Sequence, residues 1–233
     1  MAGSRGPGRD CRRARQGTGG RLLVADQYPP DADTLRALGY EKKTHHAGDL
    51  PLWRIHFTRS AHVVPWNRLR TWGPVPTSRW EPHPLPPGEA APLGAAYLGE
   101  DVLTCLAEVF QLTRFVDVDH DAPYVTAFHT TRDLVLADLT RDWLLAAGAS
   151  AQVAFGEKAR TRAWARAIHE AWPHLDGVYS LSAIALSRKV VTLWNGDAFP
   201  DRPDFSQPLN SPAILPGIAA ATAQIHYTSN III

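Results

Sequence analysis

Alternating apolar and polar residues predict a set of short β-strands, because successive side chains of a strand point to opposite faces of a sheet. The clearest alternation is in residues 50–57, where Trp53, Ile55 and Phe57 share one side of the strand and Arg54 lies on the other. Strands are predicted at residues 50–57, in a segment that ends in Tyr97, and at residues 124–129, 133–138, 177–185 and 190–194.

A helix is predicted directly after Gly99, where the hydrophobic period lengthens to between three and four residues. Either Glu100 or Asp101 is suited to cap it, because a carboxylate accepts hydrogen bonds from the free N–H groups of a first turn. Its expected buried face consists of Val102, Leu103, Leu106, Val109 and Phe110. Glu108 points roughly opposite that face, beside Thr104. On helical geometry alone, such a carboxylate is typical of a solvated surface.

Further helices are predicted from the same spacing and from their end signals. The first covers residues 31–39, with Asp33 as its N-cap and Gly39 at its end. The others cover residues 140–147, 157–172 and 216–224. Residues 42–49 are predicted to form a polar loop. Residues 65–92 contain eight prolines and three tryptophans, so we expect an irregular but ordered loop there, since each proline removes a backbone donor.

The composition indicates one soluble globular domain. The chain has 233 residues, of which 45% are hydrophobic, and no apolar run approaches the roughly 20 residues that a membrane span needs. Cys11 and Cys105 are its two cysteines, which excludes a disulfide framework and a cysteine zinc site. Without a secretory segment near the start, we expect a cytoplasmic protein with no membrane partner.

The charges are unevenly distributed along the chain. Residues 1–21 carry six arginines against one aspartate, whereas the whole chain has a formal net charge of +1. The body after this tail is therefore net acidic, which argues against nucleic-acid binding by the folded domain. We expect residues 1–22 to form a disordered basic tail.

Most familiar catalytic and metal motifs are missing from the sequence. It has no glycine-rich phosphate loop, no His/Cys metal cluster and no Gly-x-Ser-x-Gly elbow around its serines. The acidic segment at residues 117–121 lacks the spacing of a calcium loop. We therefore expect no metal.

Four segments, taken in order, resemble the RES domain family, which is named for its characteristic Arg, Glu and Ser. They are Leu52-Trp-Arg-Ile55, Ser78-Arg-Trp-Glu-Pro-His83, Ala96-Tyr-Leu98 followed by Leu106-Ala-Glu-Val109, and Asp176-Gly-Val-Tyr-Ser-Leu-Ser182. On this resemblance, residues 50–200 would be the RES domain, residues 23–49 an N-terminal helical extension, and residues 201–233 a C-terminal extension that packs on the domain.

The resemblance implies an α+β fold similar to the NAD-binding core of bacterial ADP-ribosyltransferase toxins. It implies an NAD+-degrading toxin of a toxin–antitoxin pair, whose partner is an Xre-type antitoxin protein. Position by position, Arg54 and Arg79 match the family's arginines, Tyr97 its tyrosine and Glu108 its glutamate. The family serine matches Ser182, but the residues around it differ from the family pattern, so Ser180 stays an alternative.

The chemistry of NAD+ cleavage fits these residue types. A guanidinium binds phosphate oxygens bidentately, so Arg54 and Arg79 are expected to clamp the pyrophosphate. Cleavage of the nicotinamide–ribose bond passes through an oxocarbenium-like cation, which the Glu108 carboxylate would stabilise. Tyr97 would offer an aromatic face to a base, and Ser182 or Ser180 a hydrogen bond.

The predicted activity is therefore release of nicotinamide from NAD+ by hydrolysis or phosphorolysis. NAD+ is the substrate and no cofactor is expected, with phosphate as an optional co-substrate. Two alternatives stay open: transfer of ADP-ribose to a macromolecule, and a non-catalytic protein-binding module. The sequence also leaves a homodimer open.

Overall fold

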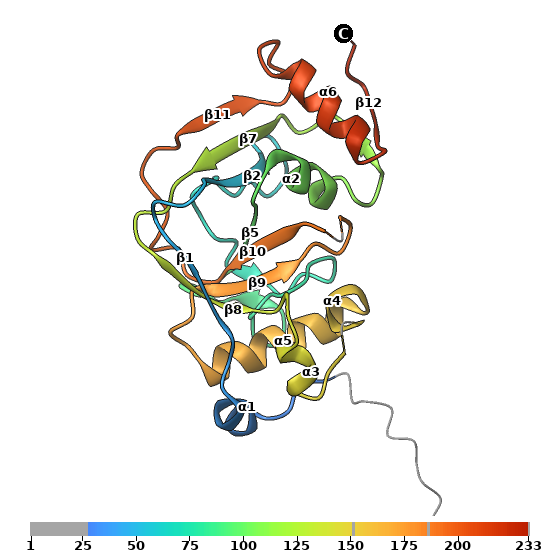
Figure 1. Cartoon of the computed structure of the whole chain (residues 1–233). Helices are drawn as coiled ribbons and strands as arrows, with labels where there is room; N and C mark the ends of the chain where they lie inside the picture. Colours follow the sequence, from blue (N-terminus) through green and yellow to red (C-terminus); the bar gives the residue numbers. More distant parts are fainter. Residues whose placement is uncertain (1–27, 151, 186, 233) are drawn as a thin grey trace, which may run out of the picture.

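One eight-stranded sheet forms the centre of the fold (Figure 1). The computed structural model describes residues 28–150, 152–185 and 187–232, so the predicted basic tail lies outside the described residues. The strand order is β1-β8-β9-β10-β5-β2-β7-β11, and β8 and β9 form its parallel pair. The strands are Lys42–His45 (β1), Leu52–Phe57 (β2), Ala96–Gly99 (β5), Pro123–Phe128 (β7), Leu134–Asp138 (β8), Gly177–Leu181 (β9), Lys189–Leu193 (β10) and Phe205–Pro208 (β11).

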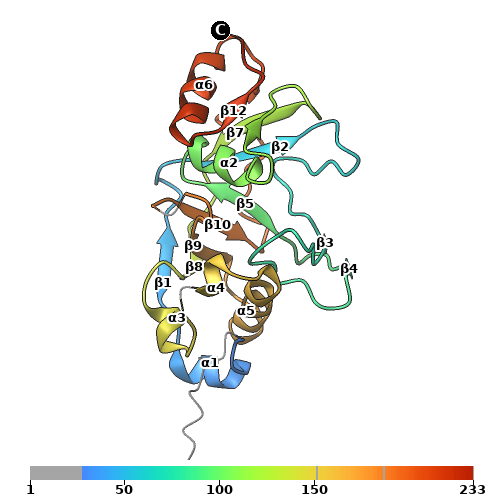
Figure 2. The same ribbon diagram turned by 90° about the vertical axis from the view of Figure 1, so that its right-hand side faces the viewer.

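The helices gather in two groups at opposite ends of this sheet (Figures 1 and 2). One group is Ala32–Leu38 (α1), Trp143–Ala146 (α3), Gln152–Phe155 (α4) and Lys158–Ala171 (α5); the other is Val102–Val109 (α2) and Leu215–Gln224 (α6). Two small ribbons complete the fold: Trp72–Gly73 (β3) with Gly88–Glu89 (β4), and Phe115–Val116 (β6) with Thr228–Ser229 (β12). This arrangement confirms the predicted α+β class.

The strand register divides the sheet into two faces. Thr192 of β10 pairs with Tyr97 of β5, and Val190 pairs with Ser180 of β9, so these side chains share one face. We call it the helical face. Gly99 is on the same face of β5 as Tyr97, and it pairs with Trp53 of β2. Trp53 and Ile55 therefore also belong to the helical face. Arg54 and His56 alternate with them and point to the other side, the loop face.

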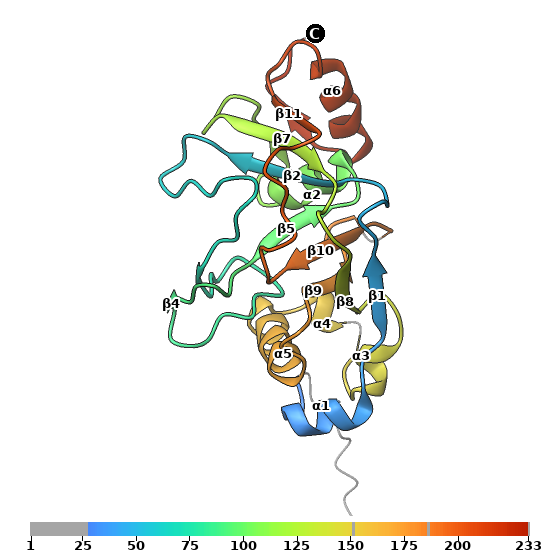
Figure 3. The same cartoon turned by 90° about the vertical axis from the view of Figure 1, so that its left-hand side faces the viewer.

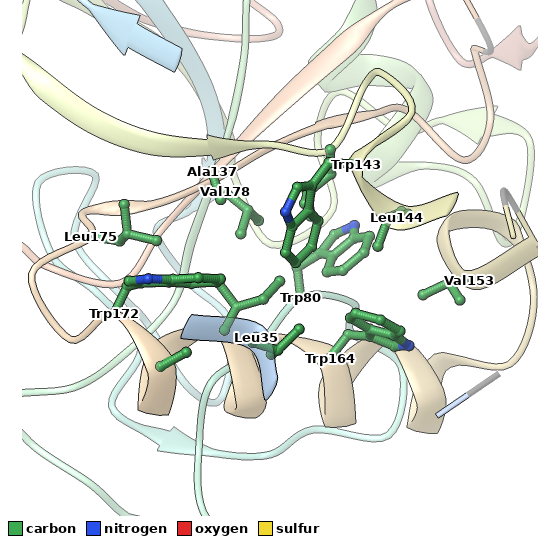
Figure 4. Packing of buried hydrophobic residues seen from close by; sticks show 14 of the residues in the cluster. Leu35, Trp80, Ala137, Trp143, Leu144, Val153, Trp164, Trp172, Leu175 and Val178 are labelled. Atoms are coloured by element: carbon green, nitrogen blue, oxygen red, sulfur yellow. The ribbon is translucent and has the colours of Figure 1, made fainter. Parts of the chain in front are cut away.

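Two separate hydrophobic clusters cover the helical face. The first lies between α5, α1, α3, α4 and the strands β8 and β9 (Figure 4), and it contains Leu35, Trp80, Ala137, Trp143, Leu144, Val153, Trp164, Ile168, Trp172 and Val178. The second lies between α2, α6 and the strands β2 and β7, and it contains Ile55, Cys105, Leu106, Phe110, Val125, Leu209 and Ile218. Between these two clusters, the central strands of the helical face are left with less helical cover.

The loop face is covered by irregular chain. Its core includes Leu52, Leu98, Phe128, Val191 and Leu193, against which Trp66, Leu69 and Phe199 pack. Trp66 and Leu69 come from the proline-rich segment at 65–92, which forms a long irregular excursion (Figure 3). The β3–β4 ribbon pairs residues near the start of this segment with residues near its end. The same segment later contributes Trp80 to the first helical-face cluster, so it links the two sides of the sheet.

Most predicted elements are present at nearly the predicted bounds. Strands β2, β7, β8 and β10 and helices α5 and α6 confirm their predictions. The end of α1 at Gly39 is also confirmed, because this residue has the left-handed φ of 78° that favours glycine. Among the described residues, no helix is long and apolar enough to cross a membrane.

Three local predictions are wrong. Asp31, not Asp33, caps α1, since its Oδ1 accepts from the Thr34 N–H at 2.8 Å. The predicted polar loop at residues 42–49 contains β1, which pairs with β8 at the sheet edge. The buried side of α2 is also turned from the predicted one, because Thr104 is 1% exposed and packs inward. Asp101 caps this helix, as one of the two predicted candidates.

Candidate active site

A cavity of about 200 Å³ lies on the helical face between the two hydrophobic clusters. Its floor comes from the central strands β5, β10 and β9, one wall from α2, and the opposite wall from the start of α5 and the chain before Trp80. Its lining includes Thr77, Ser78, Arg79, Tyr97, Glu108, Gln111, Lys158, Ser180 and Thr192. Four of the six predicted site residues therefore line one cavity: Arg79, Tyr97, Glu108 and Ser180.

Glu108 is held in this cavity by Ser182. The Ser182 hydroxyl donates to Glu108 Oε1 over 2.6 Å, and its oxygen accepts from the N–H groups of Ile184 (3.2 Å) and Ala185 (2.9 Å). Ser182 is fully buried at the end of β9, whereas Glu108 is partly exposed. Because the turn after β9 fixes the hydroxyl, Ser182 orients the carboxylate and does not itself line the cavity.

Arg79 lies in a segment that we call the strap, residues 75–79, across the cavity from α2. Its guanidinium donates to the carbonyl oxygens of Gly156 (2.7 Å) and Phe155 (3.2 Å), which binds the strap to the turn before α5. Burial lowers the pKa of Arg79, and the charge of Glu108 opposes that shift. The cation and the carboxylate therefore influence each other across the cavity.

Tyr97 places its ring in the cavity and its hydroxyl behind the strap. The hydroxyl donates to the Arg79 carbonyl at 2.7 Å and lies 3.2 Å from Glu81 Oε1. Burial raises the pKa of Tyr97 to about 12, so it remains a donor at neutral pH. Glu81 is fully buried, forms an ion pair with Arg70, and accepts from the Val75 N–H at 2.7 Å. These hydrogen bonds hold both ends of the strap, at Val75 and at Arg79.

Two hydroxyl residues form the floor of the cavity. Ser180 of β9 is 1% exposed, and Thr192 of β10 is 0% exposed. The Thr192 hydroxyl has no hydrogen-bond partner among the described residues, which is unusual for a buried polar group. Sequence reasoning missed Thr192 because it lies in an ordinary apolar strand pattern, Val-Val-Thr-Leu.

Lys158 is a second residue that sequence reasoning missed. It is the first residue of α5, and its ammonium donates to the Thr77 carbonyl of the strap at 2.6 Å. Burial lowers the pKa of Lys158, and the charge of Arg79 acts in the same direction. A lysine at a polar helix start is not distinctive in a sequence, so only the fold reveals its position in the cavity wall.

Arg54 does not line this cavity. Its side chain points to the loop face, where Nη1 donates to the carbonyl oxygens of Trp66 (2.7 Å), Arg68 (2.8 Å) and Pro65 (3.2 Å). Arg54 is 9% exposed, and burial lowers its pKa to about 10. The expectation that Arg54 and Arg79 clamp one ligand together is corrected, because the alternation of β2 places their guanidinium groups on different sides of the sheet.

His56, next to Arg54 on the loop face, predicts a loss of stability in acid. Burial and the Arg54 charge lower the pKa of His56 from 6.5 to about 4. Below pH 6.5, His56 therefore binds a proton in the unfolded chain but stays neutral in the folded protein. The free energy of unfolding falls as the pH decreases towards 4. We expect the unfolding free energy to drop by about 2 kcal/mol between pH 8 and pH 5 from this group.

Urea unfolding at both pH values tests this expectation. His56→Gln removes the titration, so its stability should change less between pH 8 and pH 5 than that of the wild type. His120→Gln is the matched control, because the His120 side chain is 77% exposed. An equal pH dependence in His56→Gln and the wild type would refute the assignment.

Comparisons with known proteins agree with this architecture. A family model described as the RES domain matches residues 51–211, which is more than half of the chain. A chain in the crystal structure of the M. tuberculosis MbcT–MbcA toxin–antitoxin complex has a similar fold, with a TM-score of 0.52 and 16% sequence identity. That similarity covers 81% of this chain and 96% of the other. No curated protein sequence matches the chain.

Proposed function

The chain belongs to the RES domain family, and from this premise we propose that it cleaves the nicotinamide–ribose bond of NAD+. One observation carries the proposal: the Glu108 carboxylate, oriented by the Ser182 hydroxyl at 2.6 Å, faces a cavity whose opposite wall is cationic. Both features are complementary to NAD+. A carboxylate stabilises positive charge that develops on the ribose, and cations bind the pyrophosphate.

In the proposed reaction, the bond between the ribose C1″ carbon and the nicotinamide nitrogen breaks first. Nicotinamide leaves as a neutral molecule with the bonding electron pair, so no acid is needed to protonate it. The ribose becomes an oxocarbenium-like cation, and Glu108 stabilises this charge more in the transition state than in the ground state. Water or phosphate then attacks C1″, and the products are ADP-ribose with a proton or ADP-ribose-1″-phosphate.

The other cavity residues bind and orient the substrate. Arg79 contributes positive charge for the pyrophosphate, and the Tyr97 ring offers an aromatic surface to a base. Ser180 lies on the floor, where its hydroxyl would bind a polar group of the ribose or of the carboxamide. Arg54 acts indirectly, by holding the first part of the 65–92 segment that carries Arg79 further along.

Substitution of the two serines separates their roles. Ser182→Ala removes the hydrogen bond to Glu108 and the acceptor of two backbone N–H groups. We expect kcat to fall about 10–100-fold and the unfolding free energy to fall by about 1–3 kcal/mol. Ser180→Ala should raise KM with a smaller change in kcat. Steady-state kinetics and urea unfolding measure both effects, and a larger kcat loss in Ser180→Ala would reverse the assignment.

The biological role that we propose is the toxin of a toxin–antitoxin pair. The family membership supports it, as does the similar fold in a solved toxin–antitoxin complex. The proposed partner is an Xre-type antitoxin protein that binds the chain and neutralises it. Induced expression should stop growth and deplete cellular NAD+, and Glu108→Gln should do neither.

The decisive experiment is incubation of the purified protein with NAD+, with and without phosphate, while free nicotinamide is measured. ADP-ribose as the product would indicate hydrolysis, and ADP-ribose-1″-phosphate would indicate phosphorolysis. Label transferred to a macromolecule would identify a transferase instead. If no nicotinamide is released under either condition, the proposed activity is wrong.

A further inference from the structure

The strap is surrounded by cations that donate to neutral oxygens. Arg79 donates to the carbonyl groups before α5, while Lys158 and Arg162 of α5 donate to carbonyl groups of the strap. Among the described residues, none of these three side chains has a carboxylate within 4.0 Å. The cavity wall therefore carries concentrated positive charge with no carboxylate of the described residues in direct contact.

Lys158 combines free donors with a place in the cavity lining. An ammonium has three N–H donors, and one of them is used by the Thr77 carbonyl at 2.6 Å. Arg162 instead donates through Nη1 to Ser78 (3.0 Å), Pro76 (3.0 Å) and Val75 (3.3 Å), and it does not line the cavity. Lys158 is thus the cation of α5 that lines the cavity and keeps free donors.

Two further features favour an anion at this place. Lys158 is the first residue of a 14-residue helix whose N-cap residue, Glu157, does not cap it with its side chain but pairs with Arg160 at 3.4 Å. The positive end of the helix dipole therefore adds to the charge of Lys158. Partial burial also removes water that would otherwise solvate the ammonium. The nearby Arg79 charge repels the ammonium, and an anion bound between the two cations would offset this repulsion. A doubly charged group would satisfy both cations together.

We propose that Lys158 and Arg79 form the binding site for the pyrophosphate of NAD+, with Lys158 in the place that the sequence had suggested for Arg54. This inference rests on the proposed function for the identity of the dinucleotide. The ammonium contacts pyrophosphate oxygens directly, from the wall opposite Glu108. Nicotinamide ribose then lies towards α2, with its C1″ carbon near the carboxylate.

The test is direct binding of ADP, which carries the pyrophosphate but has no bond for the enzyme to cleave. Calorimetry should show that Lys158→Gln binds ADP about tenfold more weakly than the wild type, with a shallower dependence of affinity on salt. Lys158→Arg should restore most of the affinity. Inhibition by free nicotinamide should be unchanged in both variants, because nicotinamide has no phosphate.

Arg162→Gln is the matched control, because Arg162 supports the same strap from the same helix without entering the cavity. It should change ADP affinity less than Lys158→Gln, even if it lowers stability. Equal ADP binding by the wild type and Lys158→Gln, or an equal loss in Arg162→Gln, would overturn the inference. ADP binding that depends on Lys158 in a protein that releases no nicotinamide would retain this site and reject the proposed reaction.

Discussion

Replacing Glu108 by glutamine is expected to slow nicotinamide release by about 10³-fold, because the preorganised negative charge opposite the ribose cation is lost. Electrostatic stabilisation of this kind usually contributes more to catalysis than any other single effect. The amide is nearly the same size as the carboxylate, and its oxygen can still accept the hydrogen from Ser182, so the cavity keeps its shape. The loss should appear in kcat, while KM changes little.

Single-turnover measurement of nicotinamide release will determine the size of this effect. Glu170→Gln is a suitable control, because Glu170 is an exposed carboxylate on α5. It removes the same charge without touching the cavity, so its rate should equal that of the wild type. A Glu108→Gln variant that retains wild-type turnover would show that Glu108 has no part in the chemistry.

Arg54→Met is expected to lower the unfolding free energy by about 3 kcal/mol. The guanidinium Nη1 is the donor for three carbonyl oxygens of residues 65–68, and methionine leaves these oxygens without it. The apolar side chain retains some packing volume, so the effect comes mainly from the lost hydrogen bonds. Urea unfolding at neutral pH measures it.

Binding of ADP distinguishes this positioning role from the direct contact that the sequence suggested. Arg79→Met should weaken ADP binding while it changes stability less, because Arg79 is one of the two cations that line the cavity. Arg54→Met should be less stable, yet its folded fraction should still bind ADP. The opposite result, with unchanged stability and lost ADP binding, would return Arg54 to the ligand site.

Hydrophobic periodicity predicted the elements that bury apolar side chains. Strand β2 and helix α5 have clear periods of two and of three to four residues, so their bounds were found to within two residues. Strands β1 (Lys-Lys-Thr-His) and β11 (Phe-Ser-Gln-Pro) were missed. Both lie at the edges of the sheet, where a strand needs a neighbouring strand more than it needs apolar residues.

The candidate site was predicted in part, and the limits have physical causes. The resemblance named Glu108, Arg79, Tyr97 and Ser180, and the fold brings these four together. Alternation along β2 placed Arg54 opposite Trp53, but it could not tell which face of the strand would carry the helices. The position of Lys158 depends on how α5 packs beside the strap. Its contact with Thr77 joins residues 81 positions apart, so it leaves no local pattern in the sequence.

The separation of the two helical-face clusters has an evolutionary consequence. Glu108 is supported by the cluster under α2 and α6, whereas Lys158 and Trp80 belong to the part of the molecule built around α5. Substitutions in one cluster therefore leave the packing of the other largely intact. Under the proposed function, catalytic rate and substrate affinity can therefore drift independently among descendants of this chain, with the central strands as the shared element that both must conserve.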